Sequence, residues 1–133
     1  MTNETPKARV LVVEDNPMNL EMLSEWLQIG GYQVDSAEDL ASACARFQAE
    51  RPTLVLLDIR LGDEDGADFA RWIRARPEPQ SGQVPVIAVT AHALRDEQDR
   101  ILQAGCNAVV CKPVDLRVLK EEMERWLRVD RRG

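Results

Sequence analysis

The chain has 133 residues, with 17 Lys and Arg against 23 Asp and Glu, a formal net charge of −6, and 44% apolar residues. This length predicts one domain over residues 1–133, with a buried core over about 8–127, a short polar N-terminal tail and an Arg-rich C-terminal tail. The acidic balance excludes broad nucleic-acid or anionic-membrane binding, because such binding needs a surplus of Lys and Arg.

The cysteines and the opening residues bear on the compartment. The three cysteines form no CxxC pair, so they predict neither a disulfide framework nor a zinc site and favour a reducing compartment. The start of the chain is polar, and no apolar run approaches the roughly 18 residues of a membrane span. We therefore expect a cytoplasmic, soluble protein without a signal peptide or membrane anchor.

Short apolar runs alternate with amphipathic segments along the chain. The runs Val10–Val13, Leu54–Leu57 and Val86–Val89 are continuous, which is typical of strands covered on both faces. Two weaker runs, Gln33–Ala37 and Ala108–Cys111, are expected at the flanks of the sheet. The pattern predicts five strands.

Helical patterns fill the segments between these runs. Asn16 and Pro17 predict an N-cap and the first residue of a helix that ends at Gly30 and Gly31. Later helices are expected over Leu40–Ala49, Ala67–Arg76, Arg95–Ala104 and from Leu116 onward, with Asp39 and Asp115 as caps. Strands that alternate with helices predict an α/β fold with a parallel, doubly wound sheet, because parallel strands need crossover helices.

Polar residues follow the strands at the edge where parallel sheets bind ligands. Glu14 and Asp15 follow the first run, Asp58 the third, Thr90 the fourth and Lys112 the fifth. Clustered carboxylates repel one another, and hard oxygen ligands favour Mg²⁺, which binds carboxylates together with phosphate oxygens. These residues predict a site for Mg²⁺ and a phosphoryl group. Asp58 is the predicted nucleophile because it stands alone at the end of a central strand.

The motifs at these strand ends resemble those of a response-regulator receiver domain from two-component signalling. They are Val13-Glu14-Asp15-Asn16, Leu57-Asp58-Ile59, Gly66 eight residues after Asp58, Val89-Thr90-Ala91, and Lys112-Pro113. The resemblance covers Ala8–Leu127. It implies a flavodoxin-like (βα)5 fold with the strand order 2-1-3-4-5.

The resemblance also implies a role for each acidic residue. Asp58 would accept a phosphoryl group from a phosphohistidine, which makes the chain a signalling phosphoacceptor and not an enzyme acting on a separate substrate. Asp15 and Asp58 would bind Mg²⁺ directly, Glu14 would act largely through water, and the backbone carbonyl of Arg60 would complete the protein ligands.

Further roles concern the phosphoryl group itself. By the resemblance, Lys112 would pair with one phosphoryl oxygen, Thr90 would hydrogen-bond another, and the Lys112–Pro113 peptide bond would be cis. Arg60 and His92 occupy two positions that this family associates with the lifetime of the phosphoryl group. We hypothesise that both cover this group and govern attack by water; the alternative is that His92 is an ordinary surface residue.

Two positions depart from the family pattern. Val109 stands where receivers usually carry Tyr or Phe, so the usual switch between a threonine and an aromatic ring is in doubt. We hypothesise that the loop Ala91–Leu94 and the helix after it transmit the signal instead. Gly62 stands where many members have proline, which predicts a more mobile loop after the acceptor.

The resemblance implies protein partners. A receiver without an appended output domain is expected to signal by protein contact and not by direct DNA binding. The expected donor is a histidine kinase or a histidine phosphotransfer protein, which would contact Pro17, Met18 and the loop at Pro113. A downstream protein target is expected at the fourth helix, fifth strand and last helix. A phosphate shuttle and a stand-alone regulator both stay open, as does a homodimer that forms on phosphorylation.

Two other classes of protein compete with this interpretation. A magnesium-dependent phosphatase or phosphotransferase would also use an aspartyl-phosphate, but Arg60 occupies the place where such enzymes usually carry a second Asp. A flavodoxin-like electron carrier is disfavoured because Glu14 and Asp15 would repel a flavin phosphate.

Overall fold

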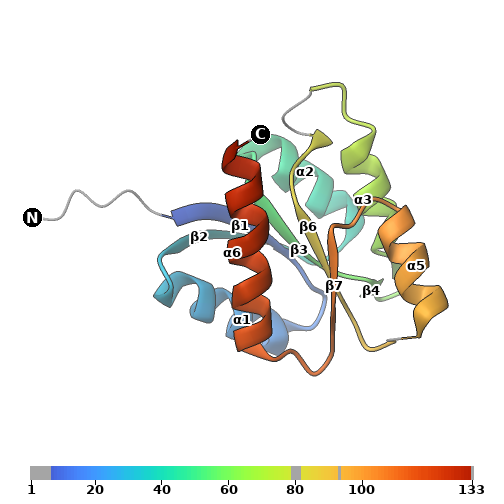
Figure 1. Cartoon of the computed structure of the whole chain (residues 1–133), viewed down its shortest axis with the longest axis horizontal. Coiled ribbons are helices and arrows are strands. Elements are labelled where there is room, and N and C mark those ends of the chain that lie inside the picture. The colour runs from blue at the N-terminus through green and yellow to red at the C-terminus, as the bar shows by residue number, and fades with distance from the viewer. Residues whose placement is uncertain (1–6, 79–81, 93, 133) are drawn as a thin grey trace, which may run out of the picture.

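The computed structural model of the chain describes residues 7–78, 82–92 and 94–132 (Figure 1). Its main sheet is parallel and has five strands in the order β2-β1-β3-β6-β7. These strands are β1 Lys7–Val13, β2 Tyr32–Ala37, β3 Leu54–Asp58, β6 Val86–Thr90 and β7 Ala108–Cys111. Numbered within this sheet alone, the order is 2-1-3-4-5, which confirms the predicted fold class.

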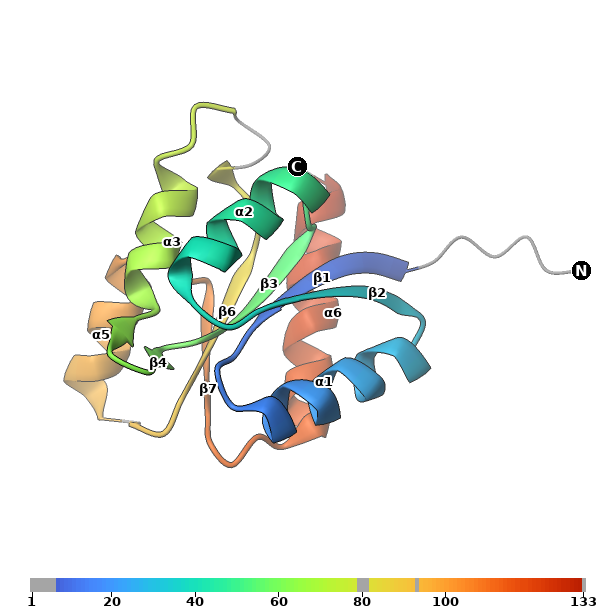
Figure 2. The ribbon, with the colours of Figure 1, turned by 180° about the vertical axis from the view of Figure 1, so that it is seen from behind.

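Helices cover both faces of this sheet. They are α1 Pro17–Ile29, α2 Leu40–Glu50, α3 Ala67–Arg74, α5 Arg95–Gln103 and α6 Leu116–Arg132. Helices α1 and α6 lie on one face, and α2, α3 and α5 lie on the other (Figures 1 and 2). The predicted helices are confirmed to within two residues at each end that was predicted. Helix α3 stops at Arg74, two residues earlier than predicted, because Pro77 disfavours helical backbone at the residue before it.

The core has two halves because successive side chains of a strand point to opposite faces of a sheet. On the face covered by α2, α3 and α5, the core includes Leu11, Val13, Phe47, Phe69 and Ile73. On the face covered by α1 and α6, it includes Val10, Val12, Leu27, Leu119 and Met123. All residues of β3 and β6 are buried, whereas β2 and β7 are partly exposed, as predicted for central and flanking strands.

The predicted helix caps are present. The side-chain oxygen of Asn16 accepts hydrogen bonds from the N–H groups of Met18 and Asn19, at 2.9 and 3.1 Å. The carboxylate of Asp39 accepts from the N–H of Ser42 at 2.8 Å. Asp115 accepts from the N–H of Arg117 at 2.9 Å. Each cap satisfies backbone donors that the first turn of a helix leaves unpaired.

A small hairpin between β3 and α3 was not predicted. Its strands, β4 Arg60–Leu61 and β5 Glu64–Asp65, pair antiparallel around the turn at Gly62 and Asp63. Strands of two residues are too short to carry a hydrophobic period, so the pattern that predicted the main strands contains no trace of them. This hairpin places the segment after Asp58 beside the carboxyl edge of the main sheet.

Some expectations concern residues beyond the described part. The N-terminal tail at 1–6, the side chains of 129–133 and Ala93 of the loop 91–94 lie outside the described residues. Within residues 7–78, 82–92 and 94–132, no helix combines the length and apolar character needed to cross a lipid bilayer.

Candidate functional site

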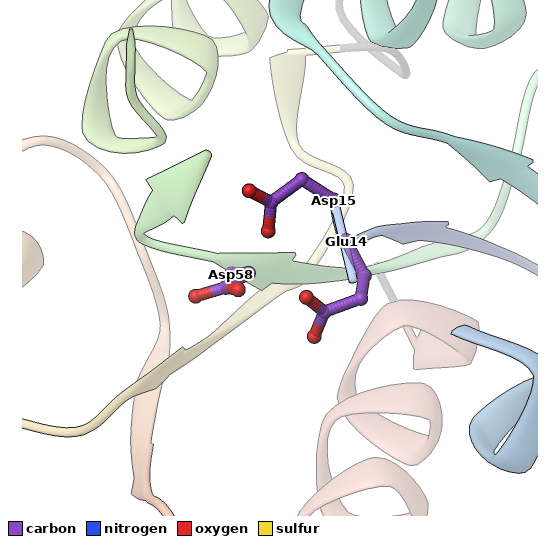
Figure 3. A group of neighbouring side chains, drawn as sticks. All are labelled: Glu14, Asp15 and Asp58. Atoms are coloured by element: carbon purple, nitrogen blue, oxygen red, sulfur yellow. The ribbon is translucent and has the colours of Figure 1, made fainter. Parts of the chain in front are cut away.

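Three carboxylates meet at the carboxyl edge of the two central strands β1 and β3. Glu14 and Asp15 directly follow β1, and Asp58 is the last residue of β3. These strands are neighbours in the sheet, so the three side chains leave it side by side (Figure 3). One carboxylate oxygen from each residue lies within 4.8 Å of the other two. The structure therefore brings together the acidic residues that the sequence predicted as a group.

The two buried carboxylates of this cluster lie close together and repel each other. Glu14 and Asp58 are only 4% and 5% exposed, whereas Asp15 is exposed. Burial raises the pKa of Glu14 well above its ordinary value, the hydrogen bond from the N–H of Asn16 opposes this, and the charge of Asp58 adds to the rise. A hard divalent cation would relieve this repulsion. Three carboxylates form a donor set that fits Mg²⁺, which prefers oxygen ligands.

Lys112 extends from the end of β7 into the acidic cluster. Its Nζ lies 3.1 Å from Oδ2 of Asp58 and 3.9 Å from Oε1 of Glu14. Its backbone N–H donates to the carbonyl of Thr90 at 2.8 Å, which fixes the start of the side chain. The peptide bond between Lys112 and Pro113 is cis. A cation of the chain thus contacts the carboxylate predicted as nucleophile.

Two residues that follow the strands meet at the exposed rim of the site. Arg60 donates its backbone N–H to Oδ1 of Asp58 at 3.2 Å, and its Nη2 lies 3.1 Å from Nε2 of His92. Thr90 is 1% exposed, and its hydroxyl oxygen accepts from the N–H of His92 at 3.1 Å. The neighbour of Asp58 on β6 is Val89, so Thr90 lies one residue beyond that pair. The structure thus joins Arg60 and His92, which the sequence could only name separately.

Val109 lies away from the rim. It pairs with Ala88 in the sheet and packs, partly buried, against the half of the core under α2, α3 and α5. Its small aliphatic side chain therefore fills core space at a position where receivers usually carry a large ring.

The sequence did not predict the contact between Gly62 and Asp15. The backbone N–H of Gly62 donates to Oδ2 of Asp15 at 2.8 Å. The one available signal was a glycine followed by Asp63 shortly after the acceptor, which is typical of a tight turn. A turn signal, however, does not tell which carboxylate the turn will contact.

A cleft of about 550 Å³ opens beside the acidic cluster. Residues of α1 form one side, including Asn19, Met22 and Leu23, and residues 112–114 form the other. Glu14 and Asp58 line its polar end. Met18, in the first turn of α1, is 80% exposed. The cleft therefore leads to the carboxylates of Glu14 and Asp58 along walls that include apolar side chains.

Comparison with known proteins yields a family match over most of the chain. Residues 10–124 match the family described as the response regulator receiver domain. Among curated proteins, the polar-differentiation response regulator DivK of Brucella anthropi is 32% identical over 122 residues, which cover 92% of this chain and 97% of that protein.

Solved structures of receiver domains have the same fold. The receiver domain of sensor histidine kinase PA1611 from Pseudomonas aeruginosa, described with a magnesium ion in its active-site cleft, is 35% identical with a TM-score of 0.80. That match covers 90% of this chain and 97% of the other. The receiver domain of a histidine kinase from Syntrophus aciditrophicus is 28% identical with a TM-score of 0.84, covering 95% and 94%.

A doubly wound sheet with an acidic cluster and a lysine at its carboxyl edge defines an α/β domain built to receive a phosphoryl group. The chain belongs to the response regulator receiver domain family. Its role is that of a DivK-like phosphoacceptor in two-component signalling, with an acidic site of the magnesium-binding kind. The phosphatase and electron-carrier alternatives are not favoured by this membership.

Proposed function

We propose that the chain acts as a response regulator in which Asp58 accepts a phosphoryl group from a phosphohistidine donor, with Mg²⁺ bound. The observation that supports this assignment most directly is the 3.1 Å contact between Nζ of Lys112 and Oδ2 of Asp58 inside a cluster of three carboxylates. In this proposal the chain works in the cytoplasm, is changed by its own phosphorylation, and turns over no separate substrate.

The residues proposed to hold Mg²⁺ are Glu14, Asp15, Asp58 and, through its backbone carbonyl, Arg60. The three side chains supply oxygen donors from β1 and β3, which suits a small hard cation. When bound, the ion neutralises charge on the phosphoryl oxygens and on the cluster. The magnesium ion in the receiver domain of PA1611 supports this assignment by similarity.

The contacts of Asp58 prepare it for attack. The N–H of Arg60 holds Oδ1 and the ammonium of Lys112 holds Oδ2, so the carboxylate has a set orientation before a donor arrives. One carboxylate oxygen attacks phosphorus as the bond from phosphorus to the donor imidazole nitrogen breaks. The electron pair stays on that nitrogen, and the donor leaves as histidine. Lys112 and the hydroxyl of Thr90 are then proposed to hold two phosphoryl oxygens.

The same site is proposed to lose the phosphoryl group by hydrolysis. Water attacks phosphorus, the bond to the Asp58 oxygen breaks, and phosphate and the free carboxylate result. We assign Arg60 and His92 to the control of this step, because their contact at 3.1 Å lies between the segments that follow β3 and β6.

The donor is proposed to be a histidine kinase or a histidine phosphotransfer protein. It would dock over α1 and the cleft between α1 and residues 112–114. Exposed Met18 on α1 and Met22, which lines the cleft, offer apolar contacts. A downstream protein would bind at α5, β7 and α6, and the proposal includes no direct DNA contact.

The test is the intact mass of the protein after incubation with acetyl phosphate and Mg²⁺. We expect one added phosphoryl group on the native chain, no addition on Asp58→Asn, and none with EDTA. Asp63→Asn is the matched control, because Asp63 lies in the exposed hairpin turn, and it should be phosphorylated like the native chain.

An adduct on Asp58→Asn equal to that on the native chain would contradict the proposal. Absence of any adduct together with a stable fluoroberyllate complex would indicate rapid hydrolysis at a working site. Absence of both would overturn the proposed acceptor role.

A further inference from the structure

The turn of the β4–β5 hairpin has a backbone that favours glycine. Gly62 has φ of +60°, a conformation that side chains other than glycine rarely adopt. A Cβ built at this position would meet as its nearest atom Oδ2 of Asp15 at 4.0 Å, which is ordinary contact. Backbone conformation, and not lack of space, therefore selects glycine here.

The hairpin is anchored to two helices and to the core. Leu61 is 3% exposed and belongs to the core under α2 and α3. Oε1 of Glu64 accepts a hydrogen bond from the N–H of Leu40, the first residue of α2, at 2.9 Å. Oδ2 of Asp65 pairs with Nη1 of Arg100 on α5 at 2.7 Å. With these three contacts the turn at Gly62 has a defined place relative to the main sheet.

From that place the N–H of Gly62 points to Asp15. It donates to Oδ2 at 2.8 Å, across 47 positions of sequence. Across residues 7–78, 82–92 and 94–132, no other hydrogen bond or ion pair involves the Asp15 carboxylate. The Asp15 side chain is exposed. Without this hydrogen bond it would rotate among its rotamers and carry its carboxylate out of the cluster.

We propose that Gly62 is a positioning residue for the metal site: its N–H holds the Asp15 carboxylate within the acidic cluster, ready to bind Mg²⁺. The inference rests on the proposed function, because it takes Asp15 as a magnesium ligand. This role differs from the prediction made from the sequence, in which Gly62 makes the loop after Asp58 more mobile. Hydrogen-bond partners of metal ligands typically change metal affinity by about 10 to 100-fold when removed.

The first experiment compares two variants at Gly62 by following backbone amide signals during a Mg²⁺ titration without a phosphoryl donor. Gly62→Pro removes the N–H and forces φ to about −65°. Gly62→Asn keeps the N–H, and Asn is among the residues that best tolerate positive φ. We expect the proline variant to bind Mg²⁺ about tenfold more weakly than the native chain, and the asparagine variant within about twofold of it.

A second measurement on the native fold needs no variant at Gly62. Hydrogen exchange of the Gly62 amide is compared between the native chain and Asp15→Asn, with Asp63→Asn as control. We expect faster exchange in Asp15→Asn alone, because the charged acceptor of that N–H is lost. Equal exchange in all three proteins would overturn the inference even where Gly62→Pro fails to fold.

The outcomes separate this inference from the proposed function. A native chain that binds no Mg²⁺ would defeat the proposed metal site itself. Mg²⁺ binding by the native chain and a folded Gly62→Pro variant with equal affinity would defeat only the role of Gly62. Equal weakening in both Gly62 variants would also defeat it, because the N–H would then not be the deciding group.

Discussion

The contact between Arg60 and His92 joins two side chains that were separate hypotheses in the sequence. Neither residue is buried, so the pair adds little to the stability of the fold. The pair lies beside Asp58, where it would meet water that approaches a phosphoryl group on that residue. At the scale of single residues, the proposed site therefore combines buried Glu14, Asp58 and Thr90 with the exposed pair Arg60 and His92.

This arrangement predicts the effect of truncating the pair. Arg60→Ala and His92→Ala should each shorten the lifetime of the aspartyl-phosphate several-fold, because each removes one side of the cover over the phosphoryl group. The double variant should change the lifetime little more than the stronger single variant, since residues in contact are not additive. The measurement is the decay of the phosphorylated mass with time after the donor is removed.

Arg71→Ala is the matched control for loss of an exposed arginine. Arg71 pairs with Asp68 on the surface of α3 and should leave the lifetime unchanged. Unchanged lifetimes in both Arg60→Ala and His92→Ala would contradict the hypothesis that these two residues govern attack by water on the phosphoryl group.

At the scale of elements, α5 is joined by a side-chain ion pair to the hairpin that follows Asp58. Arg100 of α5 pairs with Asp65 of the hairpin at 2.7 Å and with Glu97 of its own helix at 2.8 Å. Leu94, at the N-terminal end of α5, is 76% exposed and so is held by little packing. Val109 offers no large ring that could rotate between two positions. Movement of α5 is therefore the favoured route for the signal.

A phosphoryl mimic should reveal this movement. With fluoroberyllate and Mg²⁺ bound, we expect the backbone amide signals of 91–92 and α5 to shift more than those of α2. The reason is that α5 follows β6 after the short loop 91–94 and is tied to the hairpin by the pair Arg100–Asp65, whereas α2 joins the hairpin only through its first residue. Amide signals recorded with and without the mimic give the comparison. Amide signals of α5 that do not shift when the mimic binds would contradict the hypothesis that α5 transmits the signal.

At the scale of the whole molecule, the metal site exists only in the folded chain. Its carboxylates come from positions 14, 15 and 58, and the pairing of β1 with β3 brings them together. In an unfolded chain, Asp58 is 58 − 15 = 43 positions away from Asp15 along the sequence, so no comparable site exists. The proposed binding of Mg²⁺ should therefore be coupled to folding.

This coupling predicts that Mg²⁺ stabilises the protein against urea. At a concentration ten times the dissociation constant, the free energy of unfolding should rise by about 1.4 kcal/mol. Asp15→Asn should lose most of this increment, and NaCl at the same ionic strength is the control for general screening. An unfolding midpoint that does not respond to saturating Mg²⁺ would contradict the coupling.

Much of this fold could be predicted from the sequence, because local patterns control it. Three continuous apolar runs and two weaker ones predicted the five main strands, and Asn16, Asp39 and Asp115 predicted three helix starts. The parallel topology then requires that residues after neighbouring strands meet at one edge, so the convergence of Glu14, Asp15 and Asp58 was predictable. The roles given to these residues, to Thr90 and to Lys112 stay predictions until they are measured.

The amino-acid sequence by itself determined the five main strands, the helices and the residue types at the carboxyl edge of the sheet, since hydrophobic period and capping act over a few residues. The strand order followed from the resemblance to receiver domains. Only the tertiary structure decided that Gly62 contacts Asp15, that Arg60 meets His92, and that a short hairpin links the acceptor segment to α2 and α5. Those contacts join segments far apart in sequence. They depend on rotamers and turn geometry at distances of about 3 Å, which no local pattern encodes.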